Sequence, residues 1–247
     1  MINLFSAEML KLRTIRGTWG YMLSALALAA IVTAGTIGSA REDERFGLDF
    51  QPHIVRDATF ATVIITLLLG LTLVTNEFRH GTITPSFLTT PRRGFFLSAK
   101  LLAAIATGLV LVAATLVLIA AISVVWLGLL DVPLEFGDVA EPAGRVLLAA
   151  AIAGALGAAL GGLIHAQVPA LVGTLIWFFV AEPLLGGLLG LFNIDGVADY
   201  LPAAVLYAIP GHMTGGLSFL PAVLVGLAQV AVVMALAVLR TNRRDIT

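Results

Sequence analysis

The sequence has little charge: only 12% of its 247 residues are Asp, Glu, Lys or Arg, whereas 59% are hydrophobic and the mean hydropathy is +1.02. Soluble domains are about 25% charged. This chain therefore has too few polar groups to cover a surface that faces water, and we expect the lipid bilayer to be its solvent. The net charge of −1 gives no indication of a partner, and we expect no nucleic acid among the partners.

Cysteine is absent, which excludes disulfides, thiol catalysis and cysteine metal sites. Lys11 and Lys100 are the only lysines, and neither follows the G-x-x-x-x-G-K-(S/T) pattern of a phosphate-binding loop. No serine elbow with a matched histidine, facing aspartate pair or H-E-x-x-H motif occurs. We therefore expect no enzyme, no catalytic residue, no metal and no cofactor on this chain. If ATP drives it, a separate chain must bind the ATP and Mg²⁺.

Long apolar runs dominate the sequence. A helix needs about 20 mostly apolar residues to span a bilayer. The charge-free runs predict one all-α integral membrane domain over residues 1–247, with six spanning helices at about 18–39, 57–76, 99–128, 144–165, 168–192 and 218–239.

The basic residues are unevenly distributed between the two sides that six spans define. Ten of the fourteen Lys and Arg fall on the side of both termini and of the second and fourth loops, and nearly all acidic residues fall on the other side. The positive-inside rule then places both termini in the cytoplasm. We expect a multi-pass protein of the plasma membrane that contacts its lipid.

The N-terminal residues 2–16 place Ile2, Phe5, Met9 and Leu12 on one helical face. This pattern favours an amphipathic helix at the cytoplasmic interface, and the alternative is a simple extension of the first span.

Glycine and alanine also recur every four positions in the fourth span. This spacing allows two helix backbones to approach closely, either within one bundle or between subunits. The positions are Gly154, Ala158 and Gly162, and also Gly157 and Gly161.

A polar island between the second and third spans is the main functional clue. Within the loop 77–98, Thr84 and Pro85 suit the N-cap and first position of a helix, and Pro91 ends it. Gly81 lets the chain turn out of the second span. This short helix would expose Phe87 and Leu88, which need a lipid or protein partner. Arg92 and Arg93 flank them and could pair with acidic groups. The alternative is a plain connecting loop whose basic residues only fix the topology.

The string E-F-R-H-G-T-I-T-P-S-F-L-T-T-P-R-R-G-F-F-L-S-A-K, residues 77–100, resembles the signature of ABC-2 type transporter permeases. In that family an E-(F/Y)-R-x-G-T-(I/L) segment leaves the second span, and a short helix ends in P-x-R before a lysine opens the third. The motif covers about a tenth of the chain, and the six-span layout fits the rest. The matching positions are Glu77, Phe78, Arg79, Gly81, Thr82, Ile83, Pro91, Arg93 and Lys100.

This resemblance implies the membrane-spanning subunit of an ATP-binding cassette exporter. Such a subunit forms a homodimer, or a heterodimer with a paralogue, and contacts two separate ATPase subunits through the short cytoplasmic coupling helix. ATP-driven closure of the ATPases would switch the pathway from inward-facing to outward-facing. Two alternatives stay open: an ion-coupled secondary transporter, and a non-transporting membrane anchor for a cytoplasmic partner.

Glu182 is the one acid well inside an apolar run, roughly 20 Å across the membrane from Val168. Pro183 follows it and should kink the helix. A carboxylate in the membrane is a candidate for the substrate pathway. The alternative is a structural pair, with Arg145 or Arg56 as the expected partner. The residues 193–217 are apolar but broken by Gly and Pro, so we expect short re-entrant helices at the outer face.

Overall fold

The computed structural model describes residues 8–12, 14, 16–81, 93–134, 136–192, 194, 196–212 and 216–242. Within these residues the secondary structure is entirely helical. Six helices are long and apolar enough to cross a membrane, as the prediction of an all-α protein with six spanning helices requires. The expected coupling helix, Thr84 to Pro91, lies outside the described residues. Of the expected interfacial helix 2–16, residues 8–12, 14 and 16 are described, and they are helical.

The six long helical stretches follow the predicted spans, with longer ends. The helices are α2 (Arg16–Ser39), α4 (Phe50–Arg79), α6 (Arg93–Leu129), α7 (Phe136–Ile164), α8 (Gln167–Ile176) continued by η1 (Trp177–Ala181) and α9 (Glu182–Leu191), and α11 (Phe219–Asn242). Three short helices join them: α3 (Glu42–Arg45), η2 (Ala198–Tyr200) and α10 (Pro202–Ala208).

Helix α4 has 30 residues, so it is about 45 Å long. The hydrocarbon core of a bilayer is only about 30 Å thick, so α4 is longer than a span requires. This is why α4 begins at Phe50 and not near residue 57: a charged residue ends an apolar run without ending the helix. We therefore expect the polar residues of its first and last turns near the membrane surfaces.

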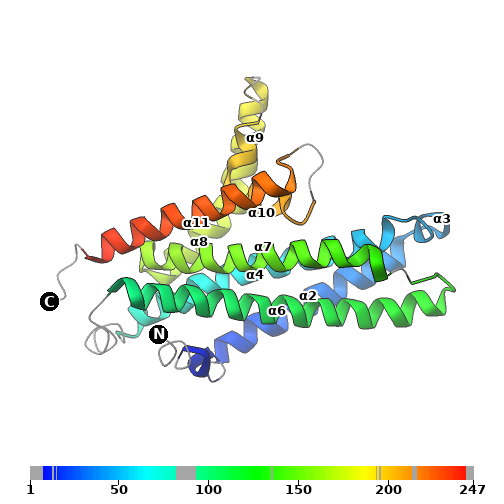
Figure 1. Ribbon diagram of the computed structural model, residues 1–247, viewed down its shortest axis with the longest axis horizontal. Coiled ribbons are helices and arrows are strands. Elements are labelled where there is room, and N and C mark those ends of the chain that lie inside the picture. Colours follow the sequence, from blue (N-terminus) through cyan, green and yellow to red (C-terminus); the bar gives the residue numbers. More distant parts are fainter. Residues whose placement is uncertain are drawn as a thin grey trace.

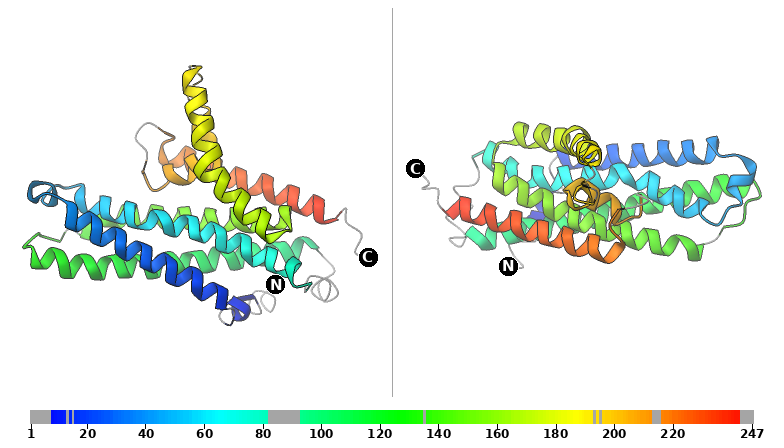
Figure 2. Two further views of the ribbon diagram at one scale, coloured as in Figure 1. Left: turned by 180° about the vertical axis from the view of Figure 1, so that it is seen from behind. Right: turned by 90° about the horizontal axis from the view of Figure 1, so that it is seen from above.

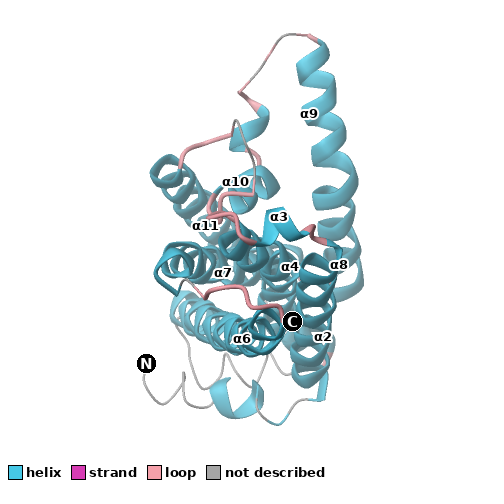
Figure 3. Cartoon of the chain, turned by 90° about the vertical axis from the view of Figure 1, so that its right-hand side faces the viewer, coloured by secondary structure: helices cyan, strands magenta, loops and turns pink. Residues whose placement is uncertain are grey.

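Helices α4 and α7 form the centre of the bundle, with α2, α6, α8 and α11 around them (Figures 1 and 3). The end of α4, the start of α6, the end of α7 and the end of α11 gather at one end of the long axis, and α3 lies at the other (Figures 1 and 2). Most of α4 is buried by its neighbours, whereas α2, α6 and α11 keep large exposed apolar faces.

The central pair packs backbone against backbone. A Cβ atom on Gly157 would lie 1.9 Å from the carbonyl oxygen of Leu67, and one on Gly161 would lie 2.6 Å from that of Leu71. Only glycine fits so close an approach. The small residues of α7 therefore serve packing within one chain, as the first of the two interpretations predicts.

The fifth span is interrupted. Between α8 and α9 the helix widens into a π-helical turn, η1, and α9 then projects away from the bundle (Figures 1 and 3). Pro183 is the second residue of α9. It cannot donate a backbone hydrogen bond, and proline and π-turns are the usual causes of such a change in helix geometry. The prediction of a local disturbance at Pro183 is confirmed.

Short helix α10 lies in the outer segment 193–217 and packs against α7 and α11. Four of its seven residues, Ala203, Val205, Leu206 and Ala208, are buried in the main core cluster. A short buried helix is thus present where re-entrant helices are expected. Its entry into the membrane from the outer face stays a prediction.

Candidate functional site

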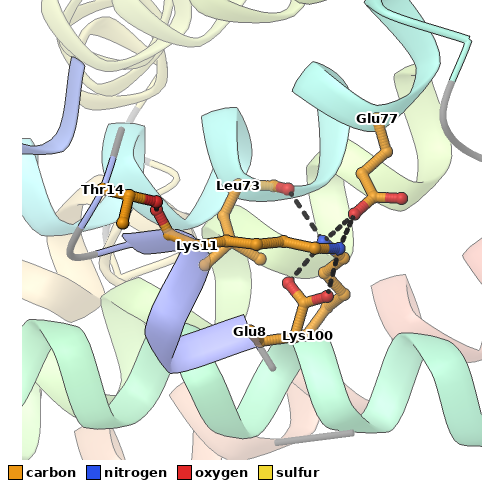
Figure 4. Close-up of polar contacts among 6 residues, drawn as sticks. All are labelled: Glu8, Lys11, Thr14, Leu73, Glu77 and Lys100. Carbon is orange, nitrogen blue, oxygen red and sulfur yellow. Dashed lines mark hydrogen bonds and ion pairs between the residues drawn. The ribbon is translucent and has the colours of Figure 1, made fainter. Parts of the chain in front are cut away.

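Four charged side chains meet at the end of the bundle where the N-terminal helical segment, α4 and α6 come together (Figure 4). We call Glu8, Lys11, Glu77 and Lys100 the ionic cluster. Lys100 Nζ lies 2.6 Å from Glu8 Oε2 and 2.7 Å from Glu77 Oε1. Lys11 Nζ lies 3.0 Å from Glu8 Oε1 and 2.8 Å from Glu77 Oε1. Each carboxylate therefore contacts both ammonium groups, and the four charges balance.

Three of the four side chains of the ionic cluster are buried, and the fourth is about half exposed to solvent. The side chain of Lys100 is 2% exposed, those of Glu8 and Glu77 are 4% and 7% exposed, and that of Lys11 is 46% exposed. An unpaired charge in such a place is very unfavourable, so burial is tolerated only because every group has two partners. The Lys100 ammonium also lies 5.4 Å from the centroid of the Phe96 ring, a favourable position for a cation.

Lys11 stays protonated at neutral pH. Its partial burial lowers its pKa, but the hydrogen bonds and negative charges of Glu77 and Glu8 outweigh this effect, so that its pKa is raised above the usual value of 10.5. The attraction that holds the N-terminal helical segment against α4 is thus present over the whole physiological pH range. On the alkaline side it would be lost as the pH rises through this raised pKa, and on the acid side as the two carboxylates take up protons.

Helix geometry explains how the chain brings these residues together. Glu77 lies in the last turn of α4, and Lys100 lies two turns after the start of α6. Glu77 and Lys100, 23 positions apart in the sequence, are joined by a direct hydrogen bond. Both ends of the 77–100 motif are therefore fixed to each other and to the N-terminal segment.

A cavity of about 390 Å³ lies beside the ionic cluster, between the N-terminal segment, α2 and α4. Its wall is mostly apolar, and Tyr21 and Thr72 share a hydrogen bond of 3.0 Å across it. The cluster thus forms one polar wall of a crevice between the first two spans.

The other predicted coupling residues fall into two groups. Arg79 donates a hydrogen bond of 2.9 Å from Nη1 to Gln167 Oε1, which ties the end of α4 to the start of α8. Gly81 has φ +66, the left-handed conformation that glycine adopts readily, so its role as the turn after the span is confirmed. Arg93 begins α6. Thr82, Thr84, Pro85, Phe87, Leu88, Pro91 and Arg92, and the side chain of Arg93, lie outside the described residues.

Sequence reasoning missed the partners of Glu77. The motif includes Glu77 and Lys100 but does not pair them, and Glu8 was not singled out. A signal was present: on the side predicted to be cytoplasmic, the only acids are Glu8, Glu77 and Asp245. Two of these three isolated acids lie in the ionic cluster.

Glu182 has partners other than those expected. Its carboxylate accepts hydrogen bonds from Trp177 Nε1 at 2.9 Å and from the backbone N–H of Ala204 at 2.7 Å, with a further backbone bond from Ala203. It therefore satisfies N–H groups in the first turn of α10 that have no partner within that helix. The expectation of Arg145 or Arg56 as the partner is wrong, because the carboxylate is occupied by an indole and by backbone groups.

This arrangement can hold helices together and transmit displacement between them. Among the described residues no group of three or more His, Cys, Asp or Glu is placed to hold a metal ion. Comparison of the sequence with protein-family models gives no match, and comparison with curated proteins gives none either.

Proposed function

We propose that this chain is the transmembrane permease subunit of an ATP-binding cassette exporter of the ABC-2 type. The six helices that are long and apolar enough to cross a membrane support a multi-pass membrane protein. The observation that carries the finer proposal is the ionic cluster. It fixes both ends of the 77–100 motif to the N-terminal helical segment. A segment that transmits force must be anchored at both ends in this way.

The path of the force follows from the packing. A partner that displaces residues 82–92 pulls on α4 at Glu77 and on α6 at Lys100, and the buried bonds between them oblige the two helices to move together. Because α4 packs backbone against backbone on α7, the displacement reaches the centre of the bundle without being absorbed by flexible side chains. The bond from Arg79 to Gln167 extends it to the fifth span.

The motor in this proposal is a separate ATPase that binds ATP and Mg²⁺. Its surface would receive Phe87 and Leu88, with Arg92 and Arg93 beside its acidic groups. A second permease copy, identical or paralogous, would complete the pathway, and the exposed apolar residues of α8 and α9 offer area for it or for lipid. Both termini and the motif would lie in the cytoplasm of a cell with this protein in its plasma membrane.

Purification from native membrane first tests whether the protein binds an ATPase partner. We expect a nucleotide-binding chain to co-purify with the full-length protein and its ATPase turnover to change on reconstitution. In the double variant Phe87→Ala with Arg93→Glu we expect transport to fall at least ten-fold while ATP hydrolysis continues and the helical content is unchanged.

The matched control is Phe46→Ala with Arg41→Glu, which changes the same residue types in an exposed loop at the opposite end of the bundle. It should leave coupling intact. Full transport in the Phe87 and Arg93 variant would contradict the proposed contact. ATPase binding without any transport in sealed vesicles would instead identify a membrane anchor, and transport driven by an ion gradient without ATP would identify a secondary carrier.

A further inference from the structure

A second polar site lies at the end of the bundle opposite the ionic cluster. There, the first turns of α4, the start of α7 and the segment after α10 enclose a cavity of about 530 Å³. Its charged lining consists of Asp49, Arg56, Asp138, Glu141 and Arg145. We call it the arginine cavity. Because α4 is longer than the hydrocarbon core is thick, we expect the cavity at its start to lie near the level of lipid headgroups.

Two guanidinium groups from different helices converge on one turn of the backbone. Gly211 has φ +84. A Cβ atom on it would lie 3.7 Å from Nη1 of Arg145 and 3.8 Å from Nη1 of Arg56. Arg56 comes from α4 and Arg145 from α7, so the two groups are carried by the main packing pair of the bundle. A single phosphate has several acceptor oxygens and can accept charge-assisted hydrogen bonds from two guanidinium groups.

The charges of these two arginines are not equally compensated. Arg145 forms an ion pair with Glu141 one turn earlier, and its guanidinium lies 4.8 Å from the centroid of the Phe219 ring. Arg56 forms no ion pair with any acid in the part of the chain that the structure describes. Two positive groups that converge, of which only one has an acidic partner, favour the binding of an anion. A guanidinium group is suited to bind a phosphate or carboxylate through two hydrogen bonds.

The remaining charges of the cavity restrict the ligand. Asp49 and Asp138 line the same space, so a ligand with only negative charge would be repelled by them. A ligand with a phosphate at one end and an ammonium at the other satisfies both sets of charges.

We propose that the arginine cavity binds a phosphoethanolamine group, with its phosphate between Arg56 and Arg145 and its ammonium near Asp49 and Asp138. The group could belong to a membrane phospholipid or to a soluble phosphodiester. This proposal does not rest on the ATPase or on the direction of transport.

The test uses the full-length chain purified in detergent, with native mass spectrometry to count bound lipids. Equimolar phosphatidylethanolamine and phosphatidylglycerol are offered, and glycerophosphoethanolamine is titrated calorimetrically as the soluble probe. We expect phosphatidylethanolamine to be retained at least five-fold over phosphatidylglycerol. Binding of the soluble probe with similar affinity would identify a soluble ligand, and retention of the lipid alone would identify a lipid.

Variants test which residues bind the phosphate of the ligand and which bind its ammonium. Arg56→Gln should weaken binding about ten-fold, the size expected for loss of one charge-assisted hydrogen bond. Arg56→Lys should restore part of it. Asp49→Asn with Asp138→Asn should abolish the preference for phosphatidylethanolamine over phosphatidylglycerol while keeping the bound phosphate. Circular dichroism and gel filtration verify the fold of each variant.

Arg41→Gln and Asp43→Asn are the matched controls, because they change the same charges at the same end of the bundle outside the cavity. They should leave binding unchanged. Equal retention of the two lipids by the wild type, or an Arg41→Gln effect as large as that of Arg56→Gln, would overturn the proposal, since either result would show only a general attraction of charge.

Discussion

Lys100 illustrates how a single charged residue can be kept inside this protein. Its ammonium lies against two carboxylates and near the backbone oxygen of Leu73, at 3.5 Å. Such an arrangement adds little net stability over a well-packed apolar core, because desolvation offsets the attraction. Removing Lys100, however, takes away the buried partner that the two carboxylates share. The ionic cluster is therefore more important for fixing the relative position of three helices than for the total stability.

Lys100→Met should show this directly. The change leaves Glu8 and Glu77 facing each other with only the half-exposed Lys11 between them. Breaking a buried ion pair costs about 3–5 kcal/mol, and about 1 kcal/mol shifts the melting temperature of a chain this long by roughly 2–4 °C. We expect the melting temperature in detergent, followed by circular dichroism, to fall by on the order of 10 °C.

Lys11→Met is the matched control, because Lys100 still bridges both carboxylates in it. Partly exposed ion pairs contribute at most about 1 kcal/mol, so its melting temperature should change by only a few degrees. Equal losses in the two variants would contradict the central position given to Lys100.

His212 provides a test of pH dependence outside the spanning helices. Burial lowers its pKa below the usual 6.5; the charge of Asp57 raises it, and those of Arg56 and His53 lower it further. The unfolded chain therefore takes up a proton near pH 6.5, whereas the folded chain does so only at lower pH. Stability should then fall as the pH drops below about 6.5.

The measurement compares the wild type with His212→Leu. Melting temperatures at pH 7.5, 6.5 and 5.5 should fall more steeply in the wild type, because the variant lacks this proton uptake. Other carboxylates lose stability in acid in both proteins, so only the difference between the two curves counts. Parallel curves would show that His212 titrates normally in the folded protein.

At the scale of whole elements, the contact between α4 and α7 organises the bundle. Glycines on both helices face carbonyl oxygens of the other: a Cβ on Gly70 would lie 2.3 Å from the oxygen of Gly154. Apolar side chains give no hydrophobic advantage to one helix contact over another in lipid, so close backbone approach and its dispersion forces become the main specific term. The other helices pack around this pair with larger side chains.

Gly157→Ala should separate the central pair. Alanine favours a helix over glycine by about 1 kcal/mol, but its Cβ would lie 1.9 Å from the carbonyl oxygen of Leu67, so the backbones must move apart. Overpacking of this kind costs about 1–3 kcal/mol, and thermal unfolding should show a net loss. Gly173→Ala in α8, with nothing within 4 Å of the added atom, should be neutral or stabilising. A Gly157 variant as stable as the Gly173 variant would refute the tight contact.

The sequence predicts these elements better than their contacts. Run length identifies all six spans, because the bilayer imposes one physical requirement on each. Helix ends are less predictable: α7 begins at Phe136, not near residue 144, because the helix continues through Asp138 and Glu141 beyond the apolar run. The turn at Gly81 follows from local chemistry alone.

Contacts between distant residues need the fold itself. Glu8 and Lys100 are 92 positions apart, and no periodicity connects them. The partner of Glu182 depends on a subtler feature. Trp177 precedes it by five residues, and a π-helical turn, whose backbone bonds join residues five apart, brings the two onto the same face. An ordinary α-helix would place Trp177 and Glu182 on different faces. The sequence pattern therefore indicates arginines as the partners of Glu182 instead.

At the scale of the whole molecule, the two ends of the bundle differ in chemistry. One end carries the balanced ionic cluster and the motif, with most of the basic residues of the chain; the other carries the arginine cavity among acidic residues. Under the positive-inside rule, this asymmetry predicts that the motif end faces the cytoplasm. The proposed contact with an ATPase requires that the motif end face the cytoplasm, where ATP is available.

The absence of cysteine allows that requirement to be tested directly, because one introduced thiol is the only one present. A membrane-impermeant maleimide is applied to Phe87→Cys in intact cells and in inverted vesicles, with Phe46→Cys as the control in the loop between the first two spans. We predict that Phe87→Cys is labelled only in inverted vesicles and Phe46→Cys only in intact cells. Labelling of Phe87→Cys from outside intact cells would contradict the account.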